Sequence, residues 1–197
     1  MSTITLENTN YKDELKRKNS KPLLWIALVS IIMFFGGITS AVIVSQGGGS
    51  FISIPMPLGF TISTFIIVLS SITFHFGFIS IKKGNYGVAT ISIGLTLLLG
   101  LLFVITQYSG WVTLHDSGFY LAGSESTQES SFLYLITGLH VVHLIGGLVS
   151  LIVVLVKTFK KKYNLEDTVG MQVSLTYWHF LGGLWIYLFF FLRYSIA

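Results

Sequence analysis

Five long apolar runs constrain the fold of this 197-residue chain more than any other feature of its sequence. A helix needs roughly 20 predominantly apolar residues to cross a bilayer, and each run is about that long or longer. A membrane-spanning strand would instead alternate apolar and polar residues over about 10 positions. Only 10% of the residues are charged, against about a quarter in soluble domains. We therefore predict an all-α polytopic membrane protein, a bundle of five transmembrane helices at about 22–45, 58–81, 86–107, 131–156 and 175–194.

The basic residues predict the orientation of the bundle. Of the 12 Lys and Arg residues, all but Arg193 lie in the N-terminal segment, between the second and third runs, or between the fourth and fifth. Cytoplasmic loops carry an excess of such residues, so we expect the N-terminus in the cytoplasm and the C-terminus outside. The bases form no stripe with interleaved aromatic residues, which excludes nucleic acid as a partner.

The N-terminal segment differs from the rest of the chain. Residues 1–20 are polar and predict a cytoplasmic tail, and residues 21–197 form the five-helix membrane domain. A basic segment before an apolar run is also typical of a signal peptide. The run from Leu23 to Val44 is longer than such regions usually are and is not followed by an A-x-A-like cleavage site. We therefore expect an uncleaved first span.

Four of the five histidines lie within the predicted spans, where polar groups are costly. His140 and His143 lie one helical turn apart and share a helix face, so they cannot together be the two axial ligands of one haem. Either could pair with His75 or His179 across the bundle, and a haem-ligating membrane cytochrome is therefore an alternative. The predicted spans contain no Asp or Glu, which excludes a di-iron site. We predict that the histidines are hydrogen-bonded within the bundle, because intramembrane polar groups commonly link helices.

A transport function and thiol chemistry are both disfavoured by residues that the sequence lacks. Apart from the histidines, the predicted spans hold no group suited to a proton or ion pathway, and the paired, broken segments of inverted-repeat transporters are missing. Cysteine is absent, which excludes disulfides and thiolate metal sites.

Small and aromatic residues indicate contacts between helices. Gly138, Val142, Gly146 and Ser150 recur every four residues along the fourth run and should let another helix approach closely. The segment Tyr177–Phe180 is predicted to begin the fifth helix near the cytoplasmic interface, as part of an aromatic belt. There its indole and imidazole together could hold a lipid headgroup or the backbone of a neighbouring subunit.

Four short motifs occur in order on four of the five predicted helices. The second helix carries Ser70–Ser71–Ile72–Thr73, an SSxT pattern, and the third carries Gly94 and Gln107 in an LG…Q pattern. The last two helices carry a TGxHxxHxxxG pattern over 137–147 and a YWHF…W pattern over 177–185. Together these motifs resemble subunit III of the haem–copper cytochrome c and quinol oxidases, in the short five-helix bacterial form that lacks the first two helices of the seven-helix form.

The resemblance implies a supporting role in a respiratory complex of the bacterial inner membrane. Subunit III of this family binds no haem or copper, which lie in partner subunits, and it has no catalytic residue of its own. It packs mainly against subunit I, which holds the catalytic centre, contacts other oxidase subunits, and carries bound phospholipid. It helps to sustain proton uptake and durable turnover while the complex transfers electrons from cytochrome c to oxygen and pumps protons. A quinol-oxidase or nitric-oxide-reductase-associated relative is an alternative. The sequence does not say whether the complex joins a respiratory supercomplex.

The motif residues are expected to make structural, lipid or subunit contacts. They are Ser70, Ser71, Thr73, His140, His143, Gly146, Trp178, His179 and Trp185.

The chain departs from the family at three positions where a carboxylate is usual. Ile31 replaces a buried glutamate of the first helix here, Gln172 replaces an acid before the YWHF segment, and Gly182 replaces an acid after it. A proton-uptake or carbodiimide-reactive role resting on those carboxylates is therefore not expected of this chain, whereas structural support is.

Overall fold

The computed structural model describes residues 2–46, 53–123, 126–163 and 168–195, with side chains from Lys18 onward. The described residues form five α-helices and no strand. The helices are α1 (Ser2–Gln46), α2 (Leu58–Lys82), α3 (Tyr86–Asp116), α4 (Gln128–Phe159) and α5 (Val169–Ser195). All five contain a stretch long and apolar enough to cross a membrane. The prediction of an all-α, five-span membrane protein is confirmed.

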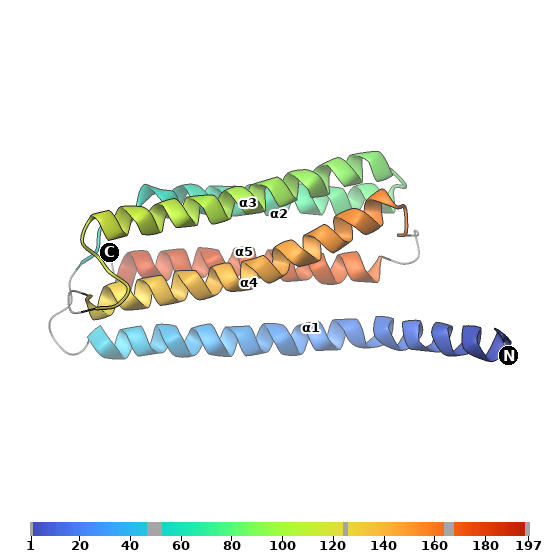
Figure 1. Ribbon diagram of the computed structural model, residues 1–197, viewed down its shortest axis with the longest axis horizontal. Helices are drawn as coiled ribbons and strands as arrows, with labels where there is room; N and C mark the ends of the chain where they lie inside the picture. The colour runs from blue at the N-terminus through green and yellow to red at the C-terminus, as the bar shows by residue number, and fades with distance from the viewer. Residues whose placement is uncertain (1, 47–52, 124–125, 164–167, 196–197) are drawn as a thin grey trace.

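The helices run alternately up and down along one long axis, so that the two termini lie at opposite ends of the bundle (Figure 1). The basic residues at Lys82–Lys83 and within 157–162 lie at the C-terminal ends of α2 and α4. These ends lie at the end of the bundle from which α1 begins (Figure 1). The basic segments therefore share one end of the bundle, which the predicted orientation requires.

α5 is the most central helix and α1 is the most peripheral. Half of the most apolar segment of α5 is buried, against 22% of that of α1. Among the described residues α1 packs only on α5 and α4, whereas α5 also contacts α2. The largest fully buried side chains include Trp178 and Trp185 of α5. The core is therefore built around α5, and many other large apolar side chains are exposed on the outside of the bundle.

α3 and α5 extend beyond their predicted ends through segments that were predicted to lie outside the spans. α3 continues beyond Gln107 to Asp116, and α5 begins at Val169 rather than at about 175. In the added part of α3, Trp111 donates its indole N–H to Thr137 of α4 at 3.0 Å. In the added part of α5, Ser174 accepts a hydrogen bond from Ser150 of α4 at 2.8 Å. Contacts with α4 therefore extend both helices through segments that are locally polar.

α1 runs without a break from the polar N-terminal residues through Pro22 into the first span. The predicted tail is thus joined to the membrane domain by helix rather than by a loop, and it extends beyond the ends of the other helices (Figure 1).

The connection from α3 to α4 is tied down by hydrogen bonds. Thr127 and Ser130 form a capping box at the start of α4, and the Ser130 hydroxyl also donates to the Tyr120 carbonyl at 2.7 Å. Glu129 lies buried in the first turn of α4, where the helix dipole favours a negative charge. Of the other acidic residues near this connection, Asp116 ends α3 and Glu125 lies outside the described residues.

Candidate functional site

Hydroxyls of α2 accept hydrogen bonds from the two tryptophans of α5. The Trp178 indole N–H donates to Ser70 Oγ at 3.1 Å, and the Trp185 indole N–H donates to Thr64 Oγ1 at 3.0 Å. The Ser70 hydroxyl in turn donates to the Ile67 carbonyl of its own helix at 2.8 Å. We call these four side chains the tryptophan–hydroxyl seam. Both indoles are almost completely buried, so the seam fixes how α2 and α5 lie against each other.

The position of Trp178 differs from its prediction at the membrane interface. Because α5 begins at Val169, Trp178 lies more than two helical turns inside the helix and is only 1% exposed. A lipid headgroup cannot reach this indole, and the prediction of an aromatic belt at this residue is wrong.

Thr73 links α2 to α3, whereas Ser71 has a different setting. The hydroxyls of Thr73 and Thr96 lie 2.9 Å apart and share a hydrogen bond. Ser71 lies one residue beyond the seam and lines the outer surface between α2 and α5. Within the SSxT motif, Ser70 and Ser71 therefore border α5, whereas Thr73 contacts α3.

Glycines let three helices meet at Trp178. A Cβ atom at Gly100 of α3 would lie 2.8 Å from the ring of Trp178 and 2.8 Å from a methyl group of Leu148. A Cβ atom at Gly147 of α4 would lie 3.1 Å from the same ring. The predicted small-residue stripe does not make this contact. Its Gly146 is exposed, and a Cβ atom there would meet only the Tyr177 hydroxyl, at 3.7 Å.

His140 is fully buried and makes no hydrogen bond within the described residues. Its ring centroid lies 5.1 Å from that of Trp185 and 5.9 Å from that of Phe103. The prediction of a hydrogen bond to another helix is wrong for this side chain. Its aromatic neighbours enclose the imidazole, so His140 also has no room to ligate a haem.

His143 faces a different part of the bundle. Its Nδ1 atom lies 2.7 Å from the Leu139 carbonyl of its own helix, and its ring packs against Phe35 of α1 at 5.6 Å. The link to α5 uses the backbone instead, because the Tyr177 hydroxyl donates to the His143 carbonyl at 3.1 Å. The predicted interhelical hydrogen bond therefore exists at His143, but the imidazole does not make it.

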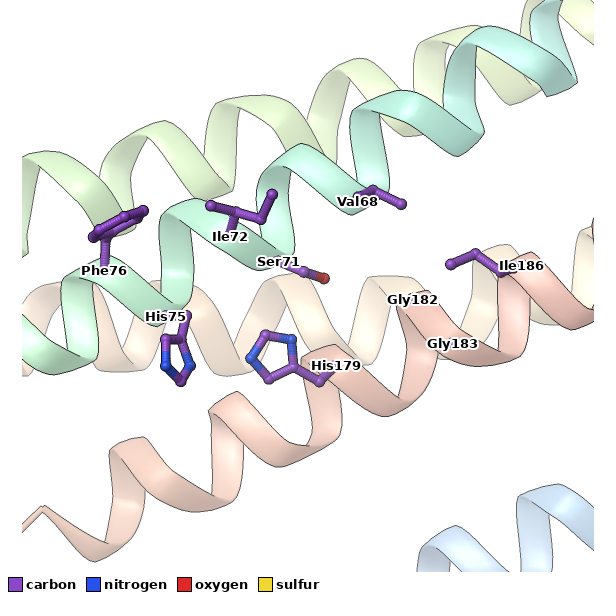
Figure 2. A pocket seen from close by; sticks show the side chains of 9 residues that line it. All are labelled: Val68, Ser71, Ile72, His75, Phe76, His179, Gly182, Gly183 and Ile186. Carbon is purple, nitrogen blue, oxygen red and sulfur yellow. The ribbon is translucent and has the colours of Figure 1, made fainter.

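His75 of α2 and His179 of α5 form the polar end of an open groove (Figure 2). Their ring centroids lie 5.9 Å apart, with 47° between the ring planes. His75 is exposed and His179 is half-buried. The groove has a volume of about 430 Å³. Its other lining residues are Val68, Ser71, Ile72, Phe76, Gly182, Gly183 and Ile186.

The three positions without the expected carboxylate have neutral surroundings. Ile31 packs against the apolar core, and the Gln172 amide donates to the Thr168 hydroxyl at 3.1 Å. A Cβ atom at Gly182 would lie 3.2 Å from Ser71 Oγ. Within the candidate membrane spans, the first of which begins at Lys18 of α1, Asp and Glu occur only near the ends, at Asp116 and Glu129.

The described residues contain no group of three or more His, Asp or Glu side chains that could hold a metal ion. The geometry instead shows packing contacts within the chain at the seam and an open groove between α2 and α5. Sequence reasoning missed Thr64, Gly100 and the pairing of His75 with His179. One signal was present, because Trp178 and Trp185 lie one heptad apart and the hydroxyls opposite them are spaced similarly.

Comparison with known proteins agrees with the family resemblance of the sequence motifs. The family model for cytochrome c oxidase subunit III matches residues 47–196. The chain is 30% identical over 173 residues to a probable cytochrome c oxidase subunit 3 of Nocardia farcinica, covering 85% of this chain and 82% of the relative. It is 29% identical over 168 residues to cytochrome c oxidase subunit 3 of Corynebacterium diphtheriae, covering 80% and 79%. It is also similar to cytochrome c oxidase subunit 3 of Thermostichus vulcanus, at 27% identity over 84% of this chain and 82% of the relative.

Proposed function

Since the chain belongs to the cytochrome c oxidase subunit III family, and so is subunit III of an aerobic haem–copper oxidase, we propose that it packs against subunit I and supports that subunit without holding a redox centre itself. Haem and copper then reside in the partner subunits. The family match across residues 47–196 is the observation that carries this proposal.

The geometry of the spans supports a scaffold role. The two indoles and the hydroxyls opposite them hold α2 and α5 together inside the chain. The one fully buried imidazole, that of His140, is enclosed by aromatic rings rather than open to a substrate or cofactor. A bundle with these features offers subunit I a rigid apolar wall.

The proposal extends to the surroundings of the complex. The bacterial sources of the relatives favour the inner membrane of a bacterium, with the basic end of the bundle in the cytoplasm. The outer surface of the bundle is largely apolar, which suits bound phospholipid and contact with other oxidase subunits or with a respiratory supercomplex.

Removal of the chain from the complex tests the support role. We expect the oxidase without this chain to start turnover at close to the normal rate and to lose activity sooner, with its haem spectrum unchanged. The measurement is oxygen consumption over time by the complex purified from a deletion strain and from the same strain with the chain restored. Identical time courses would contradict the support role, and loss of haem together with the chain would contradict the absence of a redox centre.

A further inference from the structure

We propose that the groove between α2 and α5 receives a transmembrane helix of a neighbouring oxidase subunit, which places a hydroxyl or carboxyl oxygen between His75 and His179. This inference rests on the proposed function, because it requires that other subunits of the complex lie beside this chain in the membrane.

The first observation is that the two imidazoles lack hydrogen-bond partners among the described residues. Their rings come from different helices and lie close together across the groove (Figure 2). Neither ring has a hydrogen-bond partner among the described residues. A neutral imidazole carries one N–H donor and one acceptor nitrogen, and leaving such groups unpaired in hydrocarbon is costly. We infer that a partner beyond the described residues satisfies them.

The depth of the pair excludes a phospholipid headgroup as that partner. His75 lies seven residues before Lys82, and His179 lies ten residues after Val169. At a rise of 1.5 Å per residue, the rings are about 10 and about 15 Å from those helix ends. The hydrocarbon core is about 30 Å thick, whereas α2 and α5, with 25 and 27 residues, are about 37 and about 40 Å long. With each helix centred on the core, the two rings lie about 7–10 Å inside the hydrocarbon. The oxygen must therefore be delivered by a group that itself enters the hydrocarbon.

The shape of the groove fits a helix. It extends from the two imidazoles to Val68 and Ile186, seven residues further along each helix, which is about two turns. Gly182 and Gly183 contribute no side chains to it, and a Cβ atom at Gly183 would meet nothing within 4 Å. Small residues allow transmembrane helices to approach closely. A partner helix can then place side chains from successive turns along the groove.

The spacing of the rings fits a single oxygen between them. A hydrogen bond places an oxygen about 2.7–3.2 Å from a ring nitrogen. With the ring centroids 5.9 Å apart, one oxygen can lie within that range of a nitrogen on each ring. Hydroxyl and carboxyl groups both offer such an oxygen, and a carboxylate would also complement an imidazolium.

Photo-cross-linking from the edge of the groove tests the occupant directly. A benzophenone amino acid replaces Ile72, which lines the groove and is 48% exposed, and the intact complex is irradiated in its native membrane. We expect an adduct with another protein of the oxidase, and no such adduct when detergent separates the chain from its neighbours before irradiation. Adducts with lipid or a small molecule alone would overturn the proposal.

Substitution of the imidazoles tests their contribution. His75→Phe and His179→Phe keep an aromatic ring and remove the hydrogen bonds, while His115→Phe makes the same change at an exposed histidine outside the groove. We expect each groove variant to lower retention of the chain in the complex about 3-fold to about 20-fold during a detergent titration. The control should be retained like the unmodified chain. Equal retention of all three variants would overturn the proposal.

Co-purification and cross-linking separate failure of the proposed function from failure of the groove assignment. If the unmodified chain does not purify with other oxidase subunits, the proposed function fails. If it purifies with them and Ile72 gives no protein adduct, the function stands and the assignment of this groove fails.

Discussion

The contact at Gly100 provides a sharp test of how the bundle is packed. This glycine of α3 faces α4 and α5 at the point where Trp178 meets Leu148. An alanine Cβ would lie 2.8 Å from the ring of Trp178 and 2.8 Å from a methyl group of Leu148. The leucine methyl can rotate away, but the indole is buried and hydrogen-bonded to Ser70. We therefore expect Gly100→Ala to force the helices apart.

The same helix provides a control variant against which the loss of stability can be measured. Gly94 also lies in α3, and a Cβ atom there would meet nothing within 4 Å. Gly→Ala in a helix gains up to about 1 kcal/mol of intrinsic propensity, which both variants share. Overpacking in a core costs about 1–3 kcal/mol. Gly100→Ala should therefore be less stable than Gly94→Ala by about 1–3 kcal/mol.

The assay is unfolding of the purified chain in mixed micelles with a rising fraction of SDS, followed by helix circular dichroism. The free energies of the two variants are compared at one SDS fraction. Leu148→Ala removes one of the two overlapping groups but also truncates a buried side chain. In a double-mutant cycle we therefore expect Gly100→Ala and Leu148→Ala together to cost less than the sum of their separate effects. Equal stability of Gly100→Ala and Gly94→Ala would show that the three helices do not meet as closely as described.

Four other predictions follow from the described contacts. A double-mutant cycle of Trp178→Phe and Ser70→Ala should show a coupling energy of about 0.6–1.7 kcal/mol in the same assay, and additive effects would argue against the hydrogen bond. His140→Asn and His143→Asn should leave the visible haem spectrum of the purified oxidase unchanged; loss of a haem signal at normal subunit content would revive a ligand role. Reporter fusions should show a cytoplasmic N-terminus and an external C-terminus, and a cytoplasmic signal from the C-terminal fusion would contradict the orientation. The unmodified chain should resist labelling by a hydrophobic carbodiimide within its spans, and strong labelling there would refute this expectation. Ile31→Glu should weaken assembly, because it buries a carboxyl group without a prepared partner.

The helices were predictable because the bilayer sets their length. Each apolar run must cross about 30 Å of hydrocarbon, and the bases between the runs mark their ends. The ends of α3 and α5 were less predictable, because tertiary contacts decide them. Trp111 lies in a segment that looks like a polar loop, yet its bond to Thr137 of α4 keeps it in a helix. No local pattern carries that information.

The candidate site was predictable in its residues more than in its pairings. Ser70, Trp178 and His179 stood out as polar or aromatic groups in apolar runs, and the structure gives each a distinct place. Their partners depend on how α2 and α5 are rotated about their axes, which the sequence of neither helix specifies. The enclosure of His140 by aromatic rings was not foreseen for a related reason, because the ring of Trp185 reaches it from a distant part of the chain.

The most direct test of the account is to purify the complex through a tag on this chain and then separate the chain from it. The account predicts that a haem–copper subunit purifies with the tagged chain in equal amount, and that the haem absorption stays with that subunit after separation. A tagged chain that purifies without a haem–copper subunit, or that keeps a Soret band of its own after separation, would contradict it.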